Sequence, residues 1–313
     1  MSGSLAAGQD GHQPGLRVVD SITDLDLPGL HPGARVAVAG SHGGEYSGRF
    51  ALSAGLSGVI FHDAGLGLDA AGVAGLALLD RSGVAAAAVA AASARIGDGR
   101  DVHLRGVISQ LNQAAWRCGV RAGMPCREAA SLLLSEAPGP HRPPAAGPGP
   151  LRHRPAGPAA DDQVARVRAG ARHDIWVLDS ASVAGPRQDG AIVVTGSHAA
   201  LPGGQPRRAL KCDAFLAAFN AAGSAGPEAG TEAGTQAGPG AGATRLPALD
   251  HRGIAAVAVD AMSARIGSGR STLDQGVVAV ANQRAAALGI RPGDRLATVA
   301  RALADGTERD NPR

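Results

Sequence analysis

Aromatic residues are nearly absent from this chain of 313 residues, making up 2 % of the sequence. Its cores must therefore be built from alanine, valine, leucine and isoleucine, whose small side chains favour helices packed closely on a sheet. Lysine occurs once, as Lys211, so the formal net charge of +3 comes from arginines. No basic stripe with interleaved aromatic rings is present, which counts against nucleic-acid binding.

Cysteine is also scarce, and its pattern excludes a disulfide framework. Cys118, Cys126 and Cys212 form no C-x-x-C pair, and their odd number indicates reduced, structural thiols. The first residues, 1–14, lack the charged start and apolar run of a signal peptide. The longest strongly apolar run, 84–92, is too short to span a bilayer. We therefore expect a soluble, cytoplasmic protein that does not enter a membrane.

What the sequence does contain is an internal repeat. The phrase Ser-Ala-Arg-Ile-Gly occurs at 93–97 and again at 263–267. Upstream of each copy stands Gly-Ser-His, at 40–42 and 196–198, and further upstream stands Asp-Ser, at 20–21 and 179–180. Because polar residues recur together with the apolar ones, the pattern predicts one ancestral unit used twice.

Short apolar runs alternate with helical segments within the first copy. The runs 35–39, 58–61 and 84–91 each end abruptly at polar or glycine-rich turns, which is typical of buried parallel strands. Helices are expected over 45–54, 69–81, 102–117 and 124–135. This alternation predicts an α/β fold with two tandem Rossmann-like units, each a parallel sheet in a three-layer α/β/α arrangement.

Composition divides the chain into these units and the segments around them. The segment 136–172 is rich in proline, glycine and arginine and is predicted to be a linker, and 224–243 is a low-complexity insert expected to be disordered. The expected organisation is a disordered tail over 1–15, a first unit over 16–135, a partly eroded second unit over 173–304, and a tail over 305–313.

Polar phrases follow all three predicted strands of the first unit. Ligands of parallel α/β sheets bind at the carboxyl ends of the strands, because the connecting loops and helix N-termini converge there. A site is therefore predicted at this edge of unit one. Its candidate residues are Gly40, Ser41, His42, Gly43, Gly44, His62, Asp63, Ser93, Arg95 and Asp98.

An anionic ligand is predicted from the glycine-rich loop and from Arg95. Free N–H groups of the loop Gly40–Gly44 could hold a carboxylate or phosphate, although the lysine and the spacing of a P-loop are absent. A partly buried Arg95 needs an anionic partner. That partner is either the ligand or an acid of the same fold, such as Asp80 or Asp98, and both alternatives stay open. A plain turn that needs glycine is the competing interpretation of the loop.

Catalytic chemistry is predicted from the histidines and Asp63. His42 or His62 could activate Ser93, with Asp63 orienting the ring. Against this, Ser41 and Ser93 recur in the second copy as Ser197 and Ser263, which favours a structural or ligand-binding duty for the serines.

A zinc or iron site is a further alternative for these side chains. It would use His42, His62, Asp63 and His103. None of them forms a helical i, i+4 pair, and only His42 has a histidine counterpart, His198. No metal is predicted, and no cofactor is implied.

The combined pattern predicts a small-molecule enzyme of the hydrolase type acting on an anionic metabolite bearing a carboxylate or phosphate. Gly40–Gly44, Arg95 and Asp98 would bind the anion, while His42, His62, Asp63 and Ser93 would carry the chemistry. The alternative is a non-catalytic protein that binds a small ligand or serves in assembly. A small anion is the expected partner, nucleic acid is not, and association into a homo-oligomer is left open.

Overall fold

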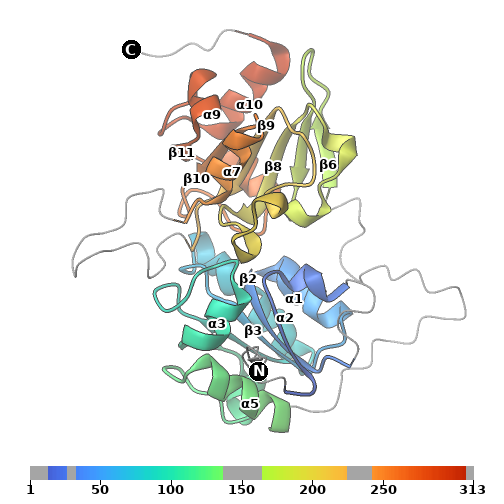
Figure 1. The fold of residues 1–313 in the computed structure, drawn as a ribbon, viewed down its shortest axis with the longest axis vertical. Helices are drawn as coiled ribbons and strands as arrows, with labels where there is room; N and C mark the ends of the chain where they lie inside the picture. The colour runs from blue at the N-terminus through green and yellow to red at the C-terminus, as the bar shows by residue number, and fades with distance from the viewer. Residues whose placement is uncertain (1–12, 27–32, 137–163, 224–241, 308–313) are drawn as a thin grey trace, which may run out of the picture.

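A computed structural model describes residues 13–26, 33–136, 164–223 and 242–307. Its strands form two mixed, largely parallel sheets of five and six strands, each covered by helices, so the chain has an α/β architecture. Figure 1 shows the two sheets one above the other along the long axis of the molecule. We call the N-terminal half unit one (residues 13–136) and the C-terminal half unit two (residues 164–307).

Unit one holds the five-stranded sheet. Four strands run parallel, and the fifth pairs antiparallel with the fourth. Its elements are β1 (Leu16–Val19), η1 (Ile22–Asp26), β2 (Val36–His42), α1 (Glu45–Ser53), β3 (Gly58–His62), η2 (Leu68–Val73), α2 (Gly75–Arg81), β4 (Ala85–Val89), α3 (Gly99–Arg105), β5 (Ile108–Leu111), α4 (Gln113–Arg117) and α5 (Cys126–Glu136).

Unit two holds the six-stranded sheet, in which β7 to β10 are parallel and both outer strands are antiparallel. Its strands are β6 (Val164–Arg168), β7 (Ile175–Leu178), β8 (Ile192–His198), β9 (Leu216–Asn220), β10 (Ala255–Val259) and β11 (Val278–Ala281). Its helices are η3 (Ala181–Val183), η4 (Pro186–Gln188), η5 (Pro202–Gly204), η6 (Pro206–Arg208), α7 (Arg245–His251), α8 (Gly269–Gln275), α9 (Gln283–Ala287) and α10 (Leu296–Asp305).

The order of the strands is sequential in both sheets, from β1 to β5 and from β6 to β11. A Rossmann sheet instead reverses its order at the centre, and its ligand binds at that reversal. Neither sheet here has such a reversal. The parallel strands of each sheet end at one common edge, because they all run in the same direction.

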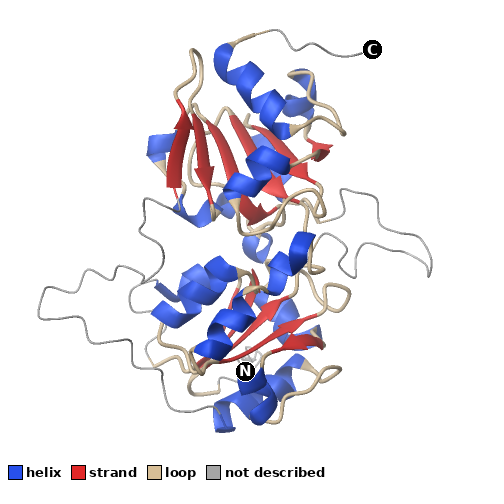
Figure 2. Cartoon of the chain, turned by 180° about the vertical axis from the view of Figure 1, so that it is seen from behind, coloured by secondary structure: helices blue, strands red, loops and turns tan. Residues whose placement is uncertain are grey.

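Alternate residues of the buried strands face opposite layers of helices. Along β2, Val36 and Val38 pack in one apolar cluster with α5, whereas Ala37 and Ala39 pack in another with Phe50 of α1. Figure 2 shows helices on both sides of the strands in each unit. This two-residue period produces two cores per sheet from small side chains. The three cysteines contribute to these cores as free, buried thiols.

The predicted helix over 102–117 is wrong, because the structure divides this segment into α3, β5 and α4. Gly106 ends α3, and Ile108 then pairs with Val89 as an antiparallel edge strand. Asn112 lies at the start of α4, where its side chain accepts a hydrogen bond from the Ala115 N–H. Asn112 and its counterpart Asn282 are therefore N-cap residues rather than residues inside a helix.

The bounds of the other predicted segments differ less from those in the structure. The predicted helix over 69–81 begins only at Gly75, after a turn in which Asp69 and Ala70 have positive φ angles. β6 lies within the predicted linker 136–172, most of which falls outside the described residues. Most of the predicted tail 1–15, of the insert 224–243 and of the tail 305–313 also falls outside them.

The two units contact one another through apolar and charged side chains. Ala64 and Ile96 of unit one form one buried cluster with Ala200, Ala222 and Ile266 of unit two. Nearby, Arg265 Nε donates to Asp69 at 2.7 Å. Within the described ranges, no helix has both the length and the apolar character needed to cross a membrane.

Candidate functional site

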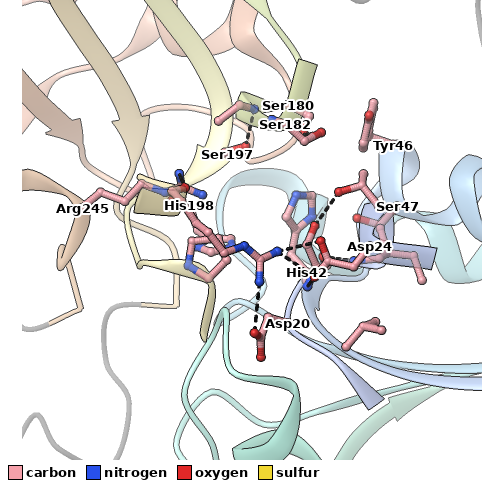
Figure 3. Close-up of a pocket in the computed structure, with 18 of the residues that line it drawn as sticks. Asp20, Asp24, His42, Tyr46, Ser47, Ser180, Ser182, Ser197, His198 and Arg245 are labelled. Carbon is pink, nitrogen blue, oxygen red and sulfur yellow. Dashed lines mark hydrogen bonds and ion pairs between the residues drawn. The ribbon is translucent and has the colours of Figure 1, made fainter. Parts of the chain in front are cut away.

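A cavity of about 630 Å³ lies between the units, where the ends of β1 and β2 face those of β7 and β8. Its wall contains residues that occupy matching places in the two copies of the Asp-Ser and Gly-Ser-His phrases. These pairs are Asp20 and Asp179, Ser41 and Ser197, and His42 and His198. Figure 3 shows side chains from both units converging on this space. The edge predicted from unit one alone is therefore one wall of a site that both units build.

The glycines before the serines let the chain segments approach closely. The Gly97 N–H donates to the Gly40 carbonyl at 2.8 Å, and a β-carbon on Gly40 would lie only 2.6 Å from the Asp98 nitrogen. In unit two the Gly267 N–H donates to the Gly196 carbonyl in the same way, at 2.7 Å. Gly40 is thus required for packing of the strand-end loop.

His42 reaches across to the other unit. Its ring lies against Gly267, where a β-carbon would be 3.0 Å from His42 Cε1, and the His198 ring lies against Gly97 at the same separation. Burial, reinforced by the neighbouring His62, lowers the pKa of His42 to about 4. The ring is therefore neutral at neutral pH.

Hydrogen bonding assigns the proton of His42. Nδ1 accepts a hydrogen bond from the Gly44 N–H at 3.1 Å, which places the ring proton on Nε2. His42 is consequently a hydrogen-bond donor rather than the general base that the sequence predicted. Burial likewise lowers the pKa of His198, whose Nδ1 is buried without a hydrogen-bond partner among the described residues.

His62 lies outside the wall of this cavity and bonds only to the backbone. Nδ1 accepts from the Ala64 N–H at 2.9 Å, and Nε2 lies 3.0 Å from the Ala94 carbonyl. Asn220 makes the same two bonds in unit two, since its Oδ1 accepts from the Ala222 N–H and its Nδ2 donates to the Ala264 carbonyl. Both residues thus tie the end of a strand to the Ser-Ala-Arg-Ile-Gly loop.

Replacing His62 with asparagine should therefore leave the fold and ligand binding unchanged. We expect His62→Asn to alter the free energy of unfolding by less than about 1 kcal/mol, whereas His62→Leu, which leaves two buried backbone groups unpaired, should cost about 2 kcal/mol or more. Urea denaturation followed by circular dichroism measures both. A folded His62→Asn protein that had lost its function would instead restore the catalytic assignment of His62.

Asp63 and Ser93 are likewise committed to hydrogen bonds within unit one. Asp63 Oδ1 accepts from the Gly65 and Ala91 N–H groups at 2.8 and 2.9 Å, and Oδ2 accepts from Ser109 Oγ at 2.7 Å. Ser93 Oγ donates to the Ala90 carbonyl at 2.7 Å and accepts from the Val107 N–H at 3.0 Å. Neither side chain lines the cavity between the units. The predicted group of nucleophile, base and acid is therefore not assembled.

Arg95 forms ion pairs within its own loop. Its Nη2 lies 3.3 Å from Asp98 Oδ2 and 3.4 Å from Asp101 Oδ1, and its backbone N–H donates to Asp101 Oδ2. Asp98 itself caps α3 by accepting from the Asp101 N–H at 2.8 Å. The anionic partner of Arg95 was expected to be either a ligand or an acid of the same fold, and in the structure it is an acid of the same fold.

The amides of the glycine-rich loop are also occupied. The Gly43 N–H donates to the His62 carbonyl at 3.1 Å, and the Gly44 N–H donates to His42. The predicted anion cradle at Gly43 and Gly44 is therefore absent. Of the ten candidate residues, only Ser41 and His42 line the cavity. Ser41 Oγ accepts from the Ile22 N–H at 2.9 Å, which holds η1 against the end of β2.

Basic side chains line the cavity from a part of unit two that lies outside the repeated phrases. Arg208 bonds across the boundary to Asp20 at 3.1 Å and to Asp24 at 2.6 Å. Arg207, Lys211 and Arg245 also line the cavity, and within the described structure no carboxylate lies at ion-pair distance from any of them.

Arg245 is a buried cation with only neutral acceptors around it. Its Nε donates to the carbonyls of His198 and Ala200 at 3.1 and 3.0 Å, and its Nη1 donates to those of Arg208 and Ala209. Burial and the charge of Arg208 lower its pKa to about 9, so it keeps its charge at neutral pH. The cavity wall therefore carries uncompensated positive charge on the side of unit two.

Sequence reasoning missed Tyr46, Asp179, Arg208 and Lys211 as residues of the site. The repeated Asp-Ser phrase was the signal for Asp179, but it lies outside the three predicted strand ends from which the site was inferred. Over the part of the chain that is described, histidine, cysteine and acidic side chains form no group of three that could hold a metal ion. Comparisons of the chain with known protein families, with curated proteins and with solved structures found no match.

Proposed function

We propose that this protein binds a small, polar, negatively charged molecule in the cavity between its two units. The observation that carries the proposal is the charge of the cavity wall. Arg207, Lys211 and Arg245 line it without a carboxylate partner among the described residues, against one carboxylate without a cation, Asp179, since Asp20 and Asp24 are paired with Arg208. Such a wall favours a ligand that supplies the missing negative charge.

Hydroxyl groups complete the lining and suit a polar ligand. Ser21, Thr23, Tyr46, Ser47 and Ser182 all border the cavity. Hydroxyls donate and accept hydrogen bonds with equal ease, so they accommodate carboxylate, phosphate or alcohol groups. A volume of about 630 Å³ is within the range of small-molecule sites.

Binding is better supported than hydrolysis. The cavity offers Ser41 as a nucleophile and His42 as a base, but the His42 lone pair at Nδ1 is occupied by the Gly44 N–H. Ser41 Oγ in turn accepts the Ile22 N–H. The remaining predicted catalytic residues bond to the backbone away from the cavity. We therefore propose the ligand-binding alternative in place of the hydrolase.

We also propose that the two units descend from one duplicated unit. Hydrogen bonds that recur at matched residues support this. Ser263 Oγ donates to the Asp260 carbonyl and accepts from the Val277 N–H, as Ser93 does with Ala90 and Val107. Unit two departs from the repeat after β8, where η5 and η6 stand in place of α1 and η6 supplies Arg207 and Arg208 to the cavity.

Calorimetric titration with defined anions tests the binding proposal. The probes are inorganic phosphate, succinate and glycerol 3-phosphate, with glycerol as the uncharged control. We expect at least one anion to bind, and the double variant Arg207→Gln/Lys211→Gln to weaken it about tenfold or more, which corresponds to about 1.4 kcal/mol.

A control variant that removes a positive charge elsewhere distinguishes the loss of a cavity cation from a lower net charge of the protein. Arg270 lies on α8, does not line the cavity, and pairs at 3.8 Å with Asp274. The Arg270→Gln variant should bind as wild type does. The proposal is overturned if none of the anions binds the wild-type protein, or if the double variant binds them as tightly.

A further inference from the structure

The carboxylates of Asp20 and Asp179, which follow β1 and β7, accept equivalent hydrogen bonds. Asp20 Oδ1 accepts from the Gly99 N–H, the first residue of α3, at 3.2 Å. Asp179 Oδ1 accepts from the Gly269 N–H, the first residue of α8, at 3.0 Å. Each carboxylate thus uses one oxygen to hold a helix, and both residues line the cavity between the units.

The second oxygens have different surroundings. Asp20 Oδ2 receives Arg208 Nη1 at 3.1 Å. Within the described structure no lysine, arginine or histidine lies at ion-pair distance from Asp179. Counting from the matched Asp-Ser phrases, Val183 occupies the place of Asp24, so the second acid that anchors Arg208 in the first half is also missing here.

Neutral hydroxyls stand beside Asp179 instead of a cation. The Tyr46 side chain, from α1 of unit one, lines the same cavity as Ser180 and Ser182, the serines that follow Asp179. Burial raises the pKa of Asp179, and the bond from Gly269 only partly opposes this. For Asp20, by contrast, the charge of Arg208 also acts against the effect of burial. A carboxylate in this position is stabilised when a positive group approaches it.

Asp179 is accessible from two sides. It borders the cavity described above and also a second one of about 470 Å³. The other charged residues of the second cavity are matched among themselves, since Arg265 pairs with Asp69 and Arg49 with Glu45. Among the described acidic residues that line these two cavities, Asp179 is therefore the one with no cation at ion-pair distance.

We infer that the ligand also carries a positive group, a protonated amine or guanidinium, which pairs with Asp179 while its anionic group lies toward Arg207 and Lys211. This rests on the proposed function and deepens it, because it names the class of ligand as zwitterionic, of the amino-acid type. The chain itself supplies the precedent, since the equivalent carboxylate takes the guanidinium of Arg208. The hydroxyls of Tyr46 and Ser182 offer further acceptors for N–H groups.

Matched probe pairs test this inference by calorimetry. They are glycine and acetate, 4-aminobutyrate and butyrate, and 6-aminohexanoate and hexanoate, which vary the distance between the charges. We expect at least one amino acid to bind wild type tenfold or more tightly than its partner without the amine. In Asp179→Asn, whose amide oxygen still accepts from Gly269, that preference should fall to within about twofold.

The exposed Asp274 provides the matched control, because Asp274→Asn removes the same charge from a residue that lines neither cavity. It should retain the preference for the amine. The inference is overturned if carboxylates with and without the amine bind wild type equally, a comparison that requires no variant, or if Asp179→Asn keeps the preference. In both cases anion binding, and with it the proposed function, stands. If no anion or amino acid binds wild type, the proposed function fails first.

Discussion

Replacing Asp63 with alanine is expected to destabilise the protein, because its carboxylate accepts hydrogen bonds from two backbone N–H groups, of which that of Ala91 is buried. Those of Gly65 and Ala91 would lose their acceptor, and Ser109 Oγ would lose one of its two partners. At about 1–3 kcal/mol for a buried group left unpaired, and less for the exposed Gly65, we expect the free energy of unfolding to fall by about 2 kcal/mol or more. Urea denaturation followed by circular dichroism gives the value.

The Asp63→Asn variant separates this structural role from catalysis. An asparagine Oδ1 can accept both amide hydrogens, and the Ser109 hydroxyl can turn to the Ala88 carbonyl, which it already approaches at 3.3 Å. Asp63→Asn should therefore unfold close to wild type and bind the same ligands. A stable Asp63→Ala protein, or a folded Asp63→Asn protein that no longer functions, would contradict this account.

Acid should destabilise the protein well above the pH at which carboxylates titrate. His42, His62 and His198 are buried, and burial lowers the pKa of each below the ordinary 6.5, to about 4 for His42. Between these values the unfolded state binds more protons than the folded state, so stability falls as the pH falls. His42 alone should remove about 2 kcal/mol between pH 7 and pH 5.

Urea midpoints measured from pH 7 to pH 5 test this, and His62→Asn provides the control. The variant keeps the hydrogen bonds of His62 but removes a titrating ring, so its stability should depend less steeply on pH. The raised pKa values of Asp20 and Asp179 act in the opposite direction, over the pH range between their raised values in the folded state and their ordinary value of 3.8. A stability that is constant or rises on acidification to pH 5 would contradict the neutral, buried state of the histidines.

The sequence predicted the α/β class and the places where polar residues follow strands, because both depend on local patterns. The run Val36–Ala39 is apolar on both faces, and Gly40 breaks it at the point where β2 approaches α3. Within unit one, the ends of the strands do lie along one edge. To this extent the arrangement of the chain could be derived from periodicity and turn chemistry alone.

What the sequence could not predict depends on contacts between distant segments. Ser109 was expected inside a helix, so its bond to Asp63 could not be anticipated. The Asp20–Arg208 pair joins residues of different units, and Arg208 lies where the repeat is lost. His42 meets Gly267 only because the two sheets face each other. Strand-end reasoning applied to one unit therefore identified one wall of the cavity and missed the other.

The reciprocal contacts of the two histidines with the two glycines have the form of an isologous interface. In a symmetric dimer, a residue that meets a second residue of the partner copy is matched by the reverse contact, and His42 with Gly267 and His198 with Gly97 obey this rule within one chain. A dimer of identical copies must present the same charge at both ends of a shared cavity. A single chain with two proposed repeats is free of that constraint. Arg208 can pair with Asp20 while Tyr46 lines the cavity on the side of Asp179. The two ends of the cavity therefore differ, so it can bind an asymmetric ligand in one orientation.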